Sequence, residues 1–301
     1  MGEIRQVAIT GANGFLGSYV VEQIIKEGFT PVLILRKNSD LWRISHLISK
    51  VHIFRMSGDE SEVEELLDLH EIDCIIHLAT EYGRDCPMSK LLNSNVIFPL
   101  TLIEGAQKRG LKLFINTDTF FAKSEFDQGY LKDYTNSKRI LEKLLIDFKD
   151  RSKIVNLRLE HVFGENDSEN KFFTSVIKAL IQNEQKIDLT EGQQKRDFVY
   201  AGDAADAYIS VIREYDGLDE FSEFEVGSGR SITVRAFVEK LAREVDSETK
   251  LRFGALASRQ GEISDSYAKN EGLKKIGWSP KYTIEMAIDR IIKKEKERFK
   301  L

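Results

Sequence analysis

The chain has 301 residues, of which 42% are hydrophobic and 31% are charged, and its formal net charge is -5. This length suits one large α/β domain or a domain with a smaller appendage, and the composition excludes a disordered chain. No apolar run approaches the roughly 18 residues that span a membrane, and the first residues lack the apolar core of a secretory signal. The basic residues are dispersed, which argues against nucleic-acid binding.

Cysteine is rare in this chain, with only Cys74 in an apolar run and Cys86 in a loop-like segment. Two cysteines offer neither a disulfide framework nor a cluster of metal ligands. We therefore expect a cytoplasmic protein that binds no metal, no membrane and no nucleic acid.

Short apolar runs alternate with longer amphipathic segments along the first half of the chain. The runs occupy residues 7–10, 31–35, 51–54, 74–80, 111–117 and 153–159. This alternation is typical of βαβ units, and nearly continuous apolar strands indicate a parallel sheet with helices on both faces. The sequence thus predicts an α/β protein with a doubly wound parallel sheet of the Rossmann type.

After Leu159 the alternation loosens, which indicates a second, discontinuous lobe. The segments "RDFVYAGDAADAYISVI" and "FEVGSG" look like a return to the sheet. We predict a dinucleotide-binding domain over residues 1–160 and 196–227, and a smaller substrate-binding lobe over residues 161–195 and 228–301.

The first predicted strand ends in "TGANGFLG", residues 10–17, which places glycine at positions 11, 14 and 17. Glycines in such a loop permit a tight turn, close approach of a pyrophosphate, and close packing of helix on strand. A glycine motif alone is weak evidence, but this one follows a strand and precedes a helix with an apolar stripe. It predicts a dinucleotide site rather than a purely structural turn.

The second predicted strand is followed by two cations, Arg36 and Lys37. An acidic residue at this position binds the ribose of NAD, whereas arginine accommodates the 2′-phosphate of NADP. The pair therefore favours NADPH over NADH as cofactor. The alternative is a solvated loop pair without function.

A tyrosine and a lysine lie four residues apart in "DYTNSK", residues 133–138, within a segment of helical periodicity. Residues at this spacing are neighbours on one helix face, and such pairs are common on solvated surfaces. In a catalytic site the ammonium of Lys138 would lower the pKa of the Tyr134 phenol from about 10 by roughly 1 to 3 units. The pair alone leaves both interpretations open.

Six segments in this order resemble the extended short-chain dehydrogenase/reductase family of nucleotide-sugar enzymes. They are "TGANGFLG", "IIHLAT", "INTDTFF", "YTNSK", "LRLEHVFG" and "RDFVYAGDAADAY". The likeness runs from about residue 4 to about residue 280. Within the family, the chain is most similar to the CDP-abequose synthases and their paratose-forming relatives, which reduce a CDP-3,6-dideoxy-4-keto-hexose for bacterial O-antigen.

This resemblance implies a mechanism. Tyr134 would give a proton to the C4 carbonyl oxygen of the sugar while NADPH delivers hydride to C4. Lys138 would lower the phenol pKa and contact the nicotinamide ribose, and the hydroxyl of Thr117 would hydrogen-bond the same carbonyl oxygen. In the family's 4,6-dehydratases an Asp-Glu pair follows this threonine, but here Asp118 is followed by Thr119, which argues against a dehydratase.

The resemblance also implies two sets of binding residues. The cofactor set comprises Thr10, Gly11, Asn13, Gly14, Phe15, Leu16, Gly17, Arg36, Lys37, Leu78, Ala79, Thr80, Asn95, Leu159 and His161, beside Tyr134 and Lys138. The substrate set comprises Glu81, Tyr82, Thr117, Asp118, Thr119, His161, Lys171, Arg196 and Arg259. Glu160 and His161 depart from the family pattern, in which asparagine often precedes the turn.

Two alternatives stay open. A nucleotide-sugar 4-epimerase uses the same side chains but recycles a tightly held NAD, and a non-catalytic dinucleotide-binding protein on this fold commonly lacks the tyrosine or lysine. The sequence leaves open both the identity of the nucleotide and the configuration of the product at C4. By analogy with relatives we expect a homodimer formed through the helices near residues 91–108 and 131–148.

Overall fold

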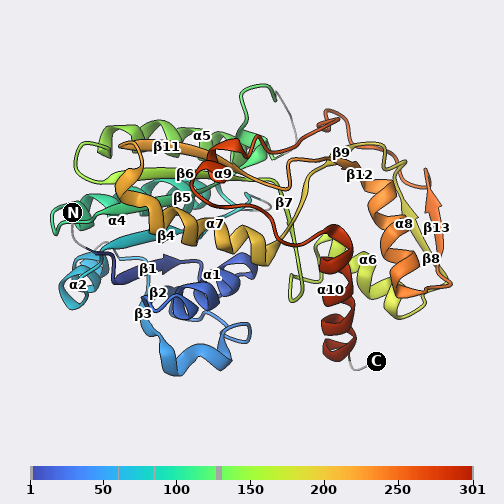
Figure 1. Ribbon diagram of the computed structural model, residues 1–301, viewed down its shortest axis with the longest axis horizontal. Helices are drawn as coiled ribbons and strands as arrows, with labels where there is room; N and C mark the ends of the chain where they lie inside the picture. Colours follow the sequence, from blue (N-terminus) through green and yellow to red (C-terminus); the bar gives the residue numbers. More distant parts are fainter. Residues whose placement is uncertain (1–2, 60, 84–85, 127–130, 300–301) are drawn as a thin grey trace.

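A seven-stranded parallel sheet forms the centre of the computed structural model, which describes residues 3–59, 61–83, 86–126 and 131–299 (Figure 1). From edge to edge its strands are β11 (Phe221–Val226), β6 (Lys153–Leu159), β5 (Leu113–Thr119), β4 (Cys74–His77), β1 (Gln6–Thr10), β2 (Thr30–Arg36) and β3 (His52–Met56). Every neighbouring pair is parallel. The predicted doubly wound parallel sheet is confirmed, and all six predicted apolar runs form strands of it.

Helices cover both faces of this sheet, because successive strand residues point to opposite sides. One face carries α1 (Phe15–Lys26) and α7 (Ala201–Glu214), which pack on each other and on residues such as Val7 and Ile9. The other face carries α2 (Ser61–Leu69), α4 (Phe98–Gln107) and α5 (Lys132–Leu145) over residues such as Ala8. Short helical segments connect these elements: η1 (Ser45–Lys50), α3 (Met88–Leu92), η2 (Asn93–Ile97), η3 (Phe120–Ala122), η4 (Ile146–Phe148), η5 (Tyr215–Gly217) and α9 (Glu271–Lys275).

A second lobe lies beside the sheet, at the right of Figure 1. It contains α6 (Phe172–Ile181), α8 (Val234–Val245), α10 (Ile284–Arg298) and the paired strands β8 (Lys186–Leu189) with β13 (Lys250–Phe253) and β9 (Lys195–Arg196) with β12 (Ile232–Thr233). A third pair, β7 (His161–Phe163) with β10 (Phe198–Tyr200), joins the lobe to the sheet domain. The chain enters the lobe after β6 and again after β11.

Packing crosses the predicted domain boundaries in two places. Phe198 and Tyr200 belong to the hydrophobic core of the lobe, together with Phe173 and Phe237. Trp278, by contrast, packs in the core under α1 and α7, and its Nε1 donates a hydrogen bond of 2.9 Å to the carbonyl oxygen of Asp203. The segment around Trp278 therefore packs against the sheet domain, although it follows the second lobe in the sequence.

Strand order reverses between β1 and β4, since β1 continues to β2 on one side while β4 leads to β5 and β6 on the other. Open parallel sheets bind ligands outside the carboxyl ends of their strands at such a reversal. Within the described ranges, no helix is both long and apolar enough to cross a bilayer.

Candidate active site

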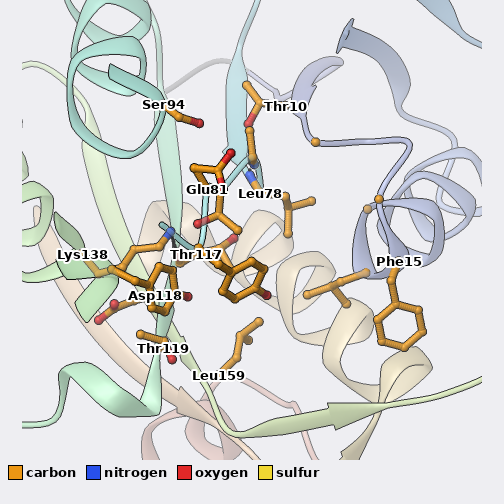
Figure 2. Close-up of a pocket in the computed structure, with 18 of the residues that line it drawn as sticks. Thr10, Phe15, Leu78, Glu81, Ser94, Thr117, Asp118, Thr119, Lys138 and Leu159 are labelled. Carbon is orange, nitrogen blue, oxygen red and sulfur yellow. Dashed lines mark hydrogen bonds between the residues drawn. The ribbon is translucent and has the colours of Figure 1, made fainter. Parts of the chain in front are cut away.

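A cavity of about 1240 Å³ opens at the carboxyl ends of β1, β2, β4, β5 and β6 and extends to the second lobe (Figure 2). Nearly all the residues predicted to bind cofactor or substrate line it. The two exceptions are Lys37 and Asn95, which lie outside the set of lining residues that the structure describes. The structure thus gathers side chains that are far apart in the sequence at the predicted edge of the sheet.

The glycine loop forms one end of the cavity, between β1 and the first turn of α1. Gly11 has a positive φ of 66°, and a Cβ there would lie 2.7 Å from the backbone nitrogen of Ala79. A Cβ on Gly17 would lie 2.1 Å from the carbonyl oxygen of Gly11. No side chain fits at either place, so the loop keeps its backbone close to β4. The start of α1 at Phe15 lines the cavity and has no side-chain cap, so its N–H groups suit a pyrophosphate.

The buried side chain of Thr10 connects this loop to the end of β4 by hydrogen bonds. Its Oγ1 accepts hydrogen bonds from the backbone nitrogens of Leu78 and Ala79, each at 3.1 Å. The same hydroxyl lies 2.9 Å from Nδ1 of the buried His77. Burial lowers the pKa of His77 well below its usual value, so the ring is neutral and structural. These bonds fix the gap between β1 and β4 in which the cavity begins.

The two basic residues predicted to bind the cofactor, Arg36 and Lys37, differ in their position relative to the cavity. Arg36 ends β2 and lines the cavity, whereas Lys37 is largely exposed and its Nζ lies 3.9 Å from Glu62. Lys37 therefore corrects the prediction, because its side chain is directed to Glu62 and solvent rather than into the cavity. Sequence reasoning missed Arg43, which lines the cavity with its Nε donating to the carbonyl oxygen of Asn166 at 2.8 Å. Nothing in the motif spacing marks Arg43.

The start of α5 carries Tyr134 and Lys138 on one buried face, with exposed fractions of 6% and 2%. Both side chains line the cavity, so the pair does not lie on a solvated helix surface. The Nζ of Lys138 donates a hydrogen bond of 2.8 Å to the backbone carbonyl oxygen of Thr117, at the end of β5 (Figure 2). The helix face and the strand end thus meet at the cavity wall.

The hydroxyl of Thr117 is hydrogen-bonded at 2.8 Å to the phenol of Tyr208, on α7. The hydroxyls that interact with the phenol of Tyr134 belong to Thr119 and Thr80. The sequence predicts Thr119 only as a substrate contact. The sequence does indicate that the side chain of Thr119 lies on the same side of β5 as that of Thr117, because residues two apart in a strand point to the same side.

The expected lowering of the Tyr134 pKa is wrong for this structure. Burial raises the pKa of Tyr134 well above its usual value, Tyr82 and Asp118 add to that rise, and hydrogen bonds from Thr119 and Thr80 oppose it. Burial also lowers the pKa of Lys138 to about 8, against the opposing effect of the Asp118 carboxylate. Sequence spacing gives the neighbours of the phenol but not its degree of burial, which here is the larger effect.

Asp118 faces the α5 side of the sheet, where it belongs to a buried ionic network. Its Oδ2 lies 3.0 Å from Nε of Arg158 on β6, and Arg158 also pairs with Glu142 at 3.1 Å and Glu223 at 2.6 Å. Burial raises the pKa of Glu142 to about 8. Asp118 is one of the residues that line the cavity, but its carboxylate is fully buried and held by an arginine, which limits its predicted role as a substrate contact.

Asn95 does not line the cavity, contrary to its predicted place beside the cofactor. It is completely buried and holds the loop after β4, because its Oδ1 accepts from the nitrogen of Glu81 at 2.7 Å. Its Nδ2 donates to the carbonyl oxygen of Glu81 at 2.8 Å and to Oγ of Ser137 at 2.9 Å. Asn95 thus ties this loop to α5.

His161 and Arg196 mark the side of the cavity that faces the second lobe. Burial, with the nearby charges of Arg196 and Lys171, lowers the pKa of His161 to about 3, so its ring is neutral. The guanidinium of Arg196 donates to the carbonyl oxygen of Ile263 at 2.7 Å and pairs with Glu262 at 3.2 Å. Arg259 lines the same region. Arg196 is thus engaged with the protein on one side and faces the cavity on the other.

A buried ion pair that the sequence did not reveal lies under this region. Nζ of Lys123 is 2.6 Å from Oε1 of Glu160, whose carboxylate also accepts a hydrogen bond from Ser266 at 2.9 Å. Burial raises the pKa of Glu160 to about 7, against the effect of the Lys123 ammonium. Glu160 was visible only as a departure from the family pattern, and Lys123 carried no signal. The pair ties the loop near residue 266 to the ends of β5 and β6.

The model of the NAD dependent epimerase/dehydratase family matches residues 7–227 of this chain. A CDP-abequose synthase of Salmonella muenchen is 34% identical over 292 residues, which cover 96% of this chain and 97% of that protein. A dTDP-4-dehydro-6-deoxyglucose reductase of Escherichia coli is 26% identical, with 95% and 96% covered.

Solved structures share the fold over nearly the whole chain. The UDP-glucose 4-epimerase of Thermotoga maritima with UDP-glucose has a TM-score of 0.82 at 21% identity, covering 98% of this chain and 99% of that one. The UDP-glucose 4-epimerase of Thermus thermophilus in complex with NAD has a TM-score of 0.79 at 19% identity, covering 96% and 98%. With its glycine cradle and its tyrosine–lysine pair, the chain belongs to the NAD-dependent epimerase/dehydratase family of extended short-chain dehydrogenases/reductases, and it is an NAD(P)-dependent nucleotide-sugar oxidoreductase.

Proposed function

We propose that this enzyme uses NADPH to reduce the C4 keto group of a nucleotide-activated sugar, a CDP-linked 3,6-dideoxy- or 6-deoxy-4-keto-hexose. The observation that carries the proposal is the Tyr134 and Lys138 pair, buried at the wall of a cavity that begins at the glycine loop. The 34% identity to a CDP-abequose synthase supports the choice of sugar and nucleotide. Reactions of this kind supply dideoxysugars for bacterial O-antigen.

The bound nicotinamide supplies the hydride, and the residues of this chain manage the proton and the substrate. The raised pKa of Tyr134 keeps the phenol protonated, so that it is ready to donate to the C4 oxygen as negative charge develops there. As the phenol loses its proton, the hydroxyls of Thr119 and Thr80 stabilise the phenolate. The ammonium of Lys138, four residues further along α5 on the same cavity wall, adds a positive charge that favours the phenolate. Lys138 is held for this role by the Thr117 carbonyl oxygen.

Two features favour reduction over dehydration. The family's dehydratases need an acid and a base after the threonine, but this chain has Thr119 where they have glutamate. The remaining acid, Asp118, is engaged by Arg158 at 3.0 Å, and its side chain is fully buried rather than exposed to a substrate. The Asp-Glu pair with which the family's dehydratases remove water across C5 and C6 is thus not present at residues 118–119.

Epimerisation at C4 is the second candidate function, because it uses the same tyrosine and lysine. Two of the arginines that line the cavity, Arg36 at the end of β2 and Arg43 after it, favour a 2′-phosphate and hence a consumed NADPH over a retained NAD. Purified protein that carries tightly bound NAD and consumes no NADPH would support the epimerase instead.

The proposal is tested by mixing the enzyme with NADPH and CDP-4-keto-3,6-dideoxyglucose and following the absorbance of NADPH. We expect stoichiometric oxidation, with a new 4-hydroxyl resonance pattern in the NMR spectrum of the product. The same assay with dTDP-, UDP- and GDP-linked 4-keto sugars shows which nucleotide is preferred. A flat trace with all four, from protein that binds NADPH, would contradict the proposal.

We also propose a homodimer and a cytoplasmic location. Ile140 and Leu144 are exposed on one side of α5, and Ile97 is exposed on the adjacent η2. Apolar residues gathered on a surface are typical of subunit interfaces.

The proposed cytoplasmic location is supported by the cysteines. Both are unpaired, which suits a reducing compartment.

A further inference from the structure

Tyr82 touches both the catalytic helix and the second lobe. Its ring centroid lies 5.0 Å from that of Tyr134, and the two rings are tilted by 35°. The Nζ of Lys171 lies 4.3 Å from the centroid of the Tyr82 ring. Lys171 precedes α6 and therefore belongs to the lobe, whereas Tyr82 follows β4 of the sheet domain. All three side chains line the cavity.

The loop that carries Tyr82 is held in a fixed conformation. Asn95 binds the backbone of Glu81 on both its N–H and its carbonyl side, at 2.7 and 2.8 Å. On the other side, Gly83 adopts a positive φ of 70°, and a Cβ there would lie 2.4 Å from Cδ1 of Leu91. Because Asn95 also binds Ser137 of α5, the loop and the catalytic helix form one unit. The backbone just before Tyr82 is thus tied to α5, and the ring of Tyr82 lies against the phenol.

The contacts of Tyr82 restrict what Tyr134 can do. Aromatic pairs at this separation favour particular tilts, and they stabilise that geometry beyond simple burial. A phenol packed against a fixed ring has fewer rotamers, and proton transfer to a ketone needs its oxygen in one place. On the opposite side, a cation over an aromatic face is attracted by the ring, so Lys171 draws the start of α6 toward the same point.

We propose that Tyr82 is a positioning residue of the active site, which orients the Tyr134 phenol and docks the substrate lobe through Lys171. The proposal rests on the proposed reduction, in which Tyr134 is the proton donor. The ring of Tyr82 matters for this role and its hydroxyl does not. When a sugar binds in the cavity, the Tyr134 phenol is then already oriented for proton transfer, and the lobe is already docked through Lys171.

The experiment compares Tyr82→Phe with Tyr82→Leu in single-turnover reduction by NADPH. The phenylalanine variant keeps the ring, and we expect its rate within about twofold of wild type. The leucine variant loses the ring, and we expect a rate about tenfold lower, in line with the worth of an aromatic pair. The affinity for NADPH, measured by fluorescence titration, should not change in either. Tyr267→Leu is the matched control, because Tyr267 is exposed and does not line the cavity.

Lys171→Met tests the other contact, since it keeps an apolar stem but removes the charge. We expect a higher KM for the sugar nucleotide with a smaller change in kcat, because the lobe docks less well while the phenol stays oriented. An unchanged rate in Tyr82→Leu would overturn the proposal. So would an equal loss in Tyr82→Phe, because the hydroxyl would then be the active part.

A measurement without substrate separates this proposal from the proposed reaction. With 3-fluorotyrosine at position 134, the fluorine resonance should stay narrow in Tyr82→Phe and become broad or split in Tyr82→Leu. That result supports the positioning role even if the natural substrate is a different keto sugar. A resonance in Tyr82→Leu identical to that of the wild type would show that the ring does not orient the phenol.

Discussion

At the scale of single residues, burial governs the chemistry of the site. Tyr134 and Lys138 face the same cavity, yet burial raises the pKa of the phenol and lowers that of the ammonium. Both shifts favour the neutral form of each group. The helical spacing predicted that the two side chains are neighbours, and in the structure both are buried on α5 and line the cavity. The direction of the phenol shift was not predictable, because a spacing of four residues does not say how much protein covers the helix face.

Replacing Tyr134 by phenylalanine removes the proton donor and leaves the shape of the cavity almost unchanged. We expect the rate of hydride transfer to fall by about a hundredfold or more, the usual worth of general acid catalysis. NADPH affinity should stay within a few-fold of wild type in a fluorescence titration. A parallel loss of NADPH binding would show that the phenol has a structural role instead.

Lys138 makes stability depend on pH. Burial lowers the pKa of Lys138 from 10.5 to about 8, so above pH 8 the folded protein releases a proton that the unfolded chain keeps. Stability therefore increases with pH between about 8 and 10, and the cost of burying the charge is fully present below that range. We expect the free energy of unfolding of wild type, relative to Lys138→Met, to rise from pH 8 to pH 10.

Urea unfolding at each pH measures this difference. The lysine variant should also lose activity at every pH, because no cation remains beside the phenol. A difference in stability that does not vary with pH would mean that the ammonium is solvated, against the 2% exposed fraction of Lys138.

At the scale of elements, most of the residues that line the cavity are positioned by the carboxyl ends of the strands. The glycine loop after β1 and the ends of β4, β5 and β6 were predicted from apolar runs followed by short motifs, and the fold confirms these strands. What the motifs left out are contacts between elements that are distant in sequence. Arg43 meets Asn166, and Lys123 meets Glu160, across 123 and 37 residues. No local pattern reports such pairs, because each partner reads as an ordinary surface residue.

The end of β2 gives a prediction about cofactor choice. Arg36 lines the cavity, whereas the neighbouring Lys37 is turned toward Glu62. We expect Arg36→Ala to weaken NADPH binding by about tenfold, since a charge-assisted hydrogen bond to phosphate is lost. NADH binding should hardly change, because NADH lacks the 2′-phosphate. Lys37→Ala is the matched control and should keep the preference of the wild type, as measured by fluorescence titration of both cofactors.

At the scale of the whole molecule, two lobes enclose one cavity, and the chain passes between them more than once. The predicted division assigns α6, α8 and α10 to one lobe, and in the structure these three helices pack on one another. It assigns Trp278 to the same lobe, whereas Trp278 packs in the core of the sheet domain. A tryptophan in an otherwise polar segment gives no indication in the sequence of which lobe it belongs to, because that depends on the core in which it packs.

The proposed dimer gives a prediction at this scale. The double variant Ile140→Glu, Leu144→Glu puts two charges on the exposed side of α5, and we expect it to sediment as a monomer in analytical ultracentrifugation. The wild type should sediment as a dimer, and so should Ile48→Glu, which alters an equally exposed isoleucine on η1. Identical sedimentation of the double variant and the wild type would place the interface elsewhere.

The pairing of β6 with β11 has a consequence for synthesis of the protein. Glu223 on β11 is the partner that closes the Arg158 network, and it follows Arg158 by 65 residues. While the ribosome is making the intervening segment, β6 is therefore an open edge, ready to pair with another nascent chain. Premature termination before Val226 would leave that edge unprotected for good, and such fragments should aggregate rather than persist as half-folded domains.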